Sequence, residues 1–124
     1  MWAELKNPRH LDFYRDLHES QAGEKFDWMP MFRAIEYLQR QSYSEVLYGF
    51  TSMAYFRVTT APSYREQDGH SSVGIGWDFN SCQYGLQFGA SCFPSQEELG
   101  ELINCPEPSF SSAIDSLILR LLQR

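Results

Sequence analysis

The sequence predicts an α+β fold: an antiparallel meander sheet of three or more strands, with two N-terminal and two C-terminal helices packed mainly on one face. Two observations lead to this prediction. Apolar residues recur at helical spacing near both ends of the chain, and apolar residues alternate with small or polar ones in its centre, 46–88. Consecutive strands usually pair as neighbours, and a sheet with helices on one face is a common layered architecture. The chain has 124 residues, which suits one domain spanning 1–124.

Two helices are predicted before the sheet. The first begins near Pro8, which suits the first helical position, with Asn7 as its N-cap and Gly23 as its stop. The second extends from about Asp27, a suitable capping residue, to Arg40. Apolar residues recur every three or four positions in both segments, so each helix is expected to bury one stripe.

Three strands are predicted in the centre of the chain, over 46–59, 73–79 and 82–88. A polar loop with turn-forming residues separates the first strand from the second, and Asn80-Ser81 is expected to form the tight turn between the second and the third. The alternation assigns one set of large residues to the face that the helices cover. That set includes Phe56, Ile75, Trp77, Cys82 and Leu86.

Two further helices are predicted after the sheet. The first follows a capping box, in which Ser95 and Glu98 exchange hydrogen bonds between side chain and backbone. Its buried edge is expected to contain Leu99, Leu102 and Ile103. The last helix starts near Ser109, and its apolar residues have nearly ideal spacing for a single buried stripe.

The second face of the predicted sheet is rich in glycine. It would carry Gly49, Thr51, Met53, Tyr55, Arg57, Gly74, Gly76, Asp78, Gln83, Gly85, Gln87 and Gly89. Glycine weakens a strand, so its repeated use requires a reason. The simplest is that Tyr55 and Met53 fold over the glycines on an otherwise solvated face. A protein partner or a flat small molecule in contact with the bare backbone would also explain them.

The segment "YREQDGH" (64–70) is the densest group of ionisable residues in a predicted loop. Arg65, Glu66, Asp68 and His70 could meet there. A solvated hairpin loop is the simpler interpretation, and a contact loop for a partner is the functional one. A catalytic acid–base pair would also need an orienting group and an adjacent pocket, which the sequence does not indicate.

Composition argues against several classes of partner. The formal net charge is −6, and the ten Lys and Arg residues are scattered, which disfavours nucleic acid. No apolar run reaches the length of a membrane span, and the first residues lack the apolar core of a secretory signal. The three cysteines form neither a CxxC pair nor a disulfide framework. We therefore expect reduced thiols and a cytoplasmic location.

Motifs for cofactors and catalysis are missing from the sequence. The segment "GIGWDFNSCQYG" (74–85) has Phe79 where a dinucleotide-binding motif needs a third glycine, and a strand rather than a helix follows it. His10 and His18 are expected at the surface or its boundary, and two helical turns hold them about 12 Å apart, too far for one metal ion. No metal and no cofactor are expected, and no catalytic residue is assigned.

The first functional hypothesis is a small acidic, non-enzymatic protein that binds another protein, as inhibitors and immunity-type modules do. Self-association through the same surface is a variant of it. The candidate contact residues are Met53, Tyr55, Arg57, Arg65, Glu66, Asp68, His70, Asp78, Gln83 and Gln87. One alternative is a small-molecule-binding protein or enzyme with a pocket between sheet and helices. Another is an accessory subunit or homo-oligomer without a site of its own.

Overall fold

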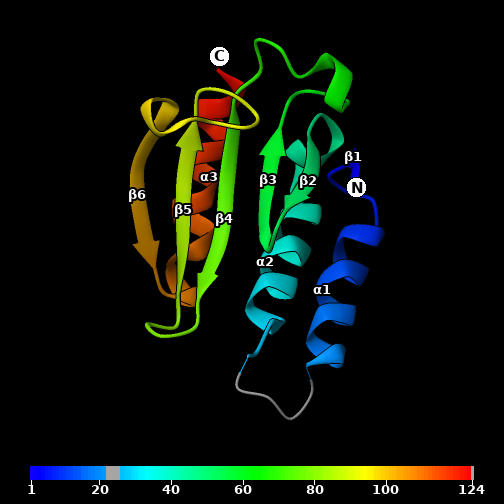
Figure 1. Cartoon of the computed structure of the whole chain (residues 1–124), viewed down its shortest axis with the longest axis vertical. Coiled ribbons are helices and arrows are strands. Elements are labelled where there is room, and N and C mark those ends of the chain that lie inside the picture. Colours follow the sequence, from blue (N-terminus) through cyan, green and yellow to red (C-terminus); the bar gives the residue numbers. More distant parts are fainter. Residues whose placement is uncertain (22–25, 124) are drawn as a thin grey trace.

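The computed structural model describes residues 1–21 and 26–123, which form a six-stranded antiparallel sheet and three α-helices (Figure 1). The α+β class predicted from the sequence is confirmed, with more strands and one helix fewer. The predicted helix stop at Gly23 lies outside the described residues. In chain order the elements are β1 (Trp2–Glu4), α1 (Arg9–Ser20), α2 (Met29–Gln39), β2 (Tyr48–Ser52), β3 (Tyr55–Thr59), β4 (Ser72–Asp78), β5 (Gln83–Gly89), β6 (Leu99–Cys105) and α3 (Phe110–Leu122), with short 3₁₀ turns at Ser42–Glu45, Tyr64–Glu66, Gln96–Glu98 and Glu107–Ser109.

The sheet is a meander with the strand order β1-β2-β3-β4-β5-β6, and every neighbouring pair is antiparallel. The predicted meander is therefore present and extends beyond the three strands of the minimal prediction. β1 was not predicted, because three residues at the start of the chain carry no periodicity that could be recognised. The helices lie together on one face of the sheet, and we call the opposite face the open face (Figure 1).

The segment 46–59 is two strands rather than the predicted one. β2 and β3 form a hairpin in which Ser52 pairs with Tyr55, so Met53 and Ala54 make the turn. Met53 adopts a φ of 58°, and its side chain is 91% exposed. The hydroxyl of Tyr14 donates a hydrogen bond of 3.0 Å to the Ala54 carbonyl, which holds the turn against α1. The sequence contains no glycine, asparagine or proline at this turn to indicate it.

This turn reverses the faces assigned to β2. Gly49 pairs with Val58 and Thr51 pairs with Phe56, so both lie on the helix face and not on the glycine-rich face where they were predicted. Phe50 pairs with Arg57 and therefore lies on the open face. A shift of one position exchanges the two faces of a strand, because side chains alternate with a period of two.

The predicted helix after the sheet is also wrong: its residues form β6. The capping box is present, and the Ser95 amide donates to the Glu98 carboxylate at 3.0 Å, but it closes only one 3₁₀ turn. From Leu99 onward the chain pairs with β5, placing Ile103 opposite Leu86. This pairing provides hydrogen-bond partners for the backbone N–H and C=O groups of β5, and it overrides the local preference of the segment for a helix.

The core lies between the helices and the sheet. Phe56, Ile75 and Leu86 are fully buried there, and Trp77 packs against them, as predicted. Cys82 does not join them, because it is exposed in the β4–β5 turn with a φ of 54°. Its left-handed backbone conformation lets the chain reverse before β5 begins.

His10 is buried, contrary to the expected surface position. Its Nε2 lies 3.1 Å from the Glu4 carbonyl and 3.3 Å from the Ala3 carbonyl, and its ring packs edge-to-face on Phe56. Burial lowers the pKa of His10, because desolvation disfavours the charged ring. His10 thus ties α1 to β1 from within the core.

A smaller apolar cluster covers the β1–β2 side of the open face. Trp2 stacks on Phe50 with ring centroids 4.1 Å apart, and its indole N–H donates to the Ala61 carbonyl at 2.9 Å. Ala61 and Cys92 complete the buried part of this cluster. The open face is therefore uncovered mainly over β3 to β6.

Candidate functional site

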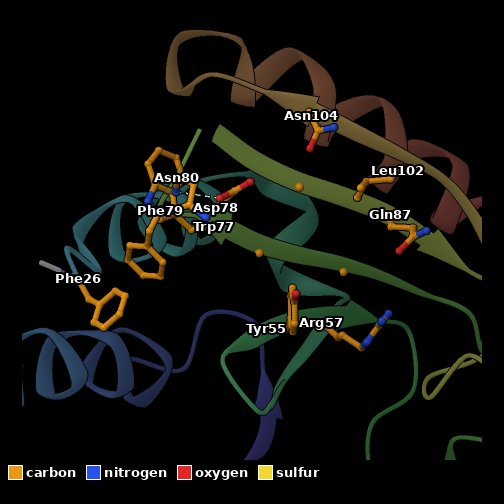
Figure 2. A pocket seen from close by; sticks show the side chains of 13 residues that line it. Phe26, Tyr55, Arg57, Trp77, Asp78, Phe79, Asn80, Gln87, Leu102 and Asn104 are labelled. Atoms are coloured by element: carbon orange, nitrogen blue, oxygen red, sulfur yellow. Dashed lines mark hydrogen bonds between the residues drawn. The ribbon is translucent and has the colours of Figure 1, made fainter. Parts of the chain in front are cut away.

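A groove of about 640 Å³ lies on the open face between β3 and β6 (Figure 2). The backbones of β4 and β5 form its floor at Gly74, Gly76 and Gly85. Side chains of β3 lie over Gly74 and Gly76, so the floor is open mainly at Gly85. Side chains of β3 form one wall, and side chains of β5 and β6 form the other (Figure 2). The sheet geometry alone positions these groups, because residues on one face recur at every second position.

The β3 wall explains two of the glycines. The Tyr55 ring lies on Gly76, where a Cβ atom would come within 2.3 Å of the ring. The Arg57 guanidinium lies over Gly74, where a Cβ would be 3.2 Å from Nη1. Tyr55 therefore covers a glycine as predicted, whereas Met53 does not: it lies in the exposed turn, and Arg57 provides the second cover.

The opposite wall consists of Gln87 from β5 with Leu102 and Asn104 from β6. The Gln87 amide donates to the Gly100 carbonyl at 2.7 Å, which fixes this side chain against the edge strand. A Cβ on Gly85 would be 3.4 Å from Leu102, an ordinary contact distance. The floor beside Leu102 is therefore open enough to accept a side chain from outside.

Two opposite charges line the groove. Arg57 is half-buried, and its Nη1 donates to Ser72 at 3.1 Å, but no carboxylate of the described residues forms an ion pair with it. Desolvation lowers the pKa of Arg57. Asp78 lies at the end nearest the β4–β5 turn, where the backbone N–H of Asn80, 2.9 Å away, lowers the pKa of its carboxyl group.

The predicted contact residues separate into two groups. Tyr55, Arg57, Asp78 and Gln87 line the groove, while Met53 and Gln83 lie outside its lining. The second group lies in the β3–β4 connection, at the end of the sheet away from the β4–β5 turn (Figure 1), and comprises Arg65, Glu66, Asp68 and His70. The His70 ring Nδ1 lies 2.7 Å from the Thr60 hydroxyl, and the other three side chains are exposed.

The sequence did not indicate Leu102 and Asn104 as groove residues, because Leu102 was predicted on the buried edge of a helix and Asn104 at the end of that helix. The segment has no clean alternation, because Leu102 and Ile103 are adjacent apolar residues, and the capping box and the spacing of the leucines favoured a helix. Phe26 also lines the groove, and its ring packs on Phe79 with centroids 5.0 Å apart. It lies outside any helix or strand, so no periodicity could indicate its position.

The cysteines and histidines of the described residues do not line the groove. Cys92 is buried, with its sulfur 3.2 Å from the Thr59 hydroxyl and 3.8 Å from the backbone carbonyl, not the ring, of His70. Burial raises the pKa of this thiol, which favours the protonated form. No group of three or more His, Cys, Asp or Glu side chains within the described residues is arranged to hold a metal ion.

The groove is not the pocket between sheet and helices that the small-molecule hypothesis expects, because it lies on the opposite face. None of the helices in the described residues has the length and apolar character needed to cross a membrane. Comparisons with protein-family models, curated proteins and solved structures each gave no match.

Proposed function

We propose that this protein acts without catalysis, by binding another protein through the open face of its sheet. The observation that carries the proposal is the groove itself: a glycine floor that is open at Gly85, an exposed aromatic side chain on one wall and a half-buried cation without an ion pair in the described residues. A partner would bury the apolar rims and supply the missing anion. Interfaces combine anchors of this kind, since Tyr and Arg are enriched among the residues that dominate binding energy.

The exposed apolar residues around the groove support this proposal. Tyr55 is 58% exposed and Leu102 is 53% exposed, and they face each other across the glycine floor (Figure 2). Apolar side chains on opposite walls of one groove form a contiguous surface, and such surfaces mark interaction sites more often than scattered ones do. The acidic surface elsewhere would accelerate association with a basic partner through long-range attraction.

Site-specific photocrosslinking in the native host tests the proposal. A photoreactive amino acid replaces Leu102 in the groove wall, and the control places it at Leu119, which is 60% exposed on α3. The proposal expects a protein adduct from the Leu102 position that is absent from the Leu119 position. Gly85→Phe, which fills the groove where a side chain has room, should abolish that adduct. Equal adducts from both positions, or an adduct that survives Gly85→Phe, would contradict the proposal.

A small-molecule ligand is the second candidate, and the size of the groove favours it. A volume of about 640 Å³ lies within the usual range for ligand sites. Native mass spectrometry of gently purified protein separates the two candidates. A small bound mass that disappears in Gly85→Phe would favour the ligand, whereas a stoichiometric protein adduct with the same sensitivity would favour the partner.

A further inference from the structure

We propose that the groove binds an extended peptide segment of the partner that carries an acidic and a basic residue four positions apart, the acidic one on Arg57 and the basic one on Asp78. This inference rests on the proposed function and specifies the chemistry of the partner. The inference depends on four features of the groove: the cation Arg57, the anion Asp78, the spacing between them, and the open floor at Gly85.

Arg57 provides the anion site. A guanidinium has five N–H donors in a fixed plane, and one of its nitrogens, Nη1, donates to Ser72. The remaining donors have no carboxylate within ion-pair distance among the described residues, although the group is half-buried. A carboxylate is the partner that matches this geometry, since it can accept two parallel hydrogen bonds from the guanidinium. An acidic side chain on the peptide would complete the pair.

Asp78 provides the cation site at the other end. The carboxylate is exposed, and hydrogen bonds from the Asn80 and Ser81 amides to Oδ1 favour its charged form. Among the described residues, Arg57 and Asp78 are the two charged residues of the groove lining, and their charges are opposite. A bipolar ligand complements the groove better than a purely acidic or purely basic one.

The spacing of the two charges selects an extended peptide. Arg57 lies over Gly74, and Asp78 is four residues further along β4, which corresponds to about 13 Å. A free amino acid, whose ammonium and carboxylate groups are bonded to the same carbon, cannot contact both sites with them. In an extended peptide, side chains four positions apart point to the same side at the same spacing.

The groove shape favours a peptide over a second copy of this chain. Between the two charges the floor is open at Gly85, beside Leu102, and can receive the apolar side chain of the middle residue. Two copies placed face to face would set one concave surface on another and leave this space unfilled. Each copy also has a net charge of −6, which opposes their association.

An NMR titration with designed peptides tests the proposal. The probes are acetylated and amidated peptides with the sequences SETLTKS and SKTLTES, which carry both charges in the two chain directions. The controls SETLTES and SKTLTKS have like charges at the same spacing. The amide resonances of Gly74, Gly76 and Gly85 report on the groove floor directly. We expect at least one mixed-charge peptide to shift these resonances at lower concentration than either like-charge control.

Charge-removing variants test the two ends separately. Arg57→Gln should weaken the mixed-charge peptide about tenfold, because it removes a charge-assisted hydrogen-bonding site that is partly shielded from water. Asp78→Asn, which retains an oxygen to cap the turn, should weaken it about two- to fivefold, as expected for an exposed pair. The matched controls Arg65→Gln and Glu66→Gln remove the same charges at the far end of the sheet and should leave affinity unchanged.

Three results would overturn the proposal: equal binding of like-charge peptides, groove resonances that do not move at millimolar peptide, or Arg65→Gln acting as strongly as Arg57→Gln. Concentration-dependent broadening of the groove resonances without peptide would identify a second copy as the occupant instead. The photocrosslinking experiment at Leu102 does not depend on the charges. A crosslinked partner with no peptide binding would therefore refute the bipolar peptide and leave the proposed function standing, while failure of both would refute both.

Discussion

Gly49→Ala tests the β2–β3 turn. The added Cβ would lie 2.3 Å from Cζ of Phe56 and 3.0 and 3.2 Å from two further atoms of that ring. Apolar carbon atoms pack at about 3.5–4.0 Å, so the ring would have to move by more than about 1 Å. Phe56 is fully buried, and His10 packs on it with ring centroids 5.1 Å apart, so the ring can move only by displacing its neighbours.

Overpacking of this kind costs about 1–3 kcal/mol. Alanine also restricts the unfolded chain relative to glycine, which offsets about 0.4–1 kcal/mol of that cost. We therefore expect the free energy of unfolding to fall by about 1–2 kcal/mol, with a drop in Tm of about 3–10 °C for a chain of this size. Urea unfolding followed by circular dichroism, with calorimetry for Tm, measures both quantities.

Gly85→Ala is the matched control, because it makes the same change in another strand of the sheet. Its Cβ meets Leu102 at 3.4 Å and is close to no other group except Asn104, at 4.0 Å. The variant should be as stable as the wild type or up to about 1 kcal/mol more stable. Equal effects of the two substitutions would refute the reasoning, since a continuous strand over 46–59 would place both glycines on the same open face.

Three further predictions concern groups outside the groove. Burial lowers the pKa of His10, so on acidification the unfolded chain binds a proton more readily than the folded protein does, and the free energy of unfolding should decrease as pH falls from about 7 towards 5. In His10→Gln this decrease should be smaller, and a pH profile equal to that of the wild type would contradict the buried position of His10. A thiol reagent should modify Cys82 rapidly in the native protein and the two buried thiols only after unfolding; more than one fast-reacting thiol would contradict the structure. Asp115 accepts hydrogen bonds from the Tyr37 and Tyr43 hydroxyls at 2.7 and 2.9 Å, so Asp115→Ala should lower the free energy of unfolding by about 1–3 kcal/mol in urea titrations, and a neutral result would show that the two hydroxyls find other partners.

The elements that could be predicted from sequence are those whose local pattern agrees with their final packing. The stripe of α3 is buried on one side, and in β4 large apolar residues alternate with small ones; both elements form close to where they were predicted. In the segment after Ser95, local and tertiary preferences conflict. The capping box forms its turn there, but the next residues pair with β5. This pairing depends on β5, which lies outside the segment, so the local sequence alone does not indicate it.

The residues of the candidate site could be predicted only where the strand that carries them was predicted. Tyr55, Arg57, Asp78 and Gln87 lie in strands whose alternation was correctly assigned, and the structure brings them to one groove. The second wall could not be predicted, because β6 was taken for a helix. The loop residues of 64–70 are polar, as several groove residues are, but they lie at the other end of the sheet. Polarity alone does not indicate at which end of a sheet a loop lies.

The position of β1 has a consequence for the order of folding. β2 to β6 can form from successive hairpins, whereas Trp2 must reach Ala61, 59 positions along the chain, to make its hydrogen bond. Closing a loop of that size costs more entropy than closing a hairpin, so β1 should join the sheet after the rest has formed. The stacking of Trp2 on Phe50 places an indole at this junction, so a late phase in refolding fluorescence would time the completion of the sheet.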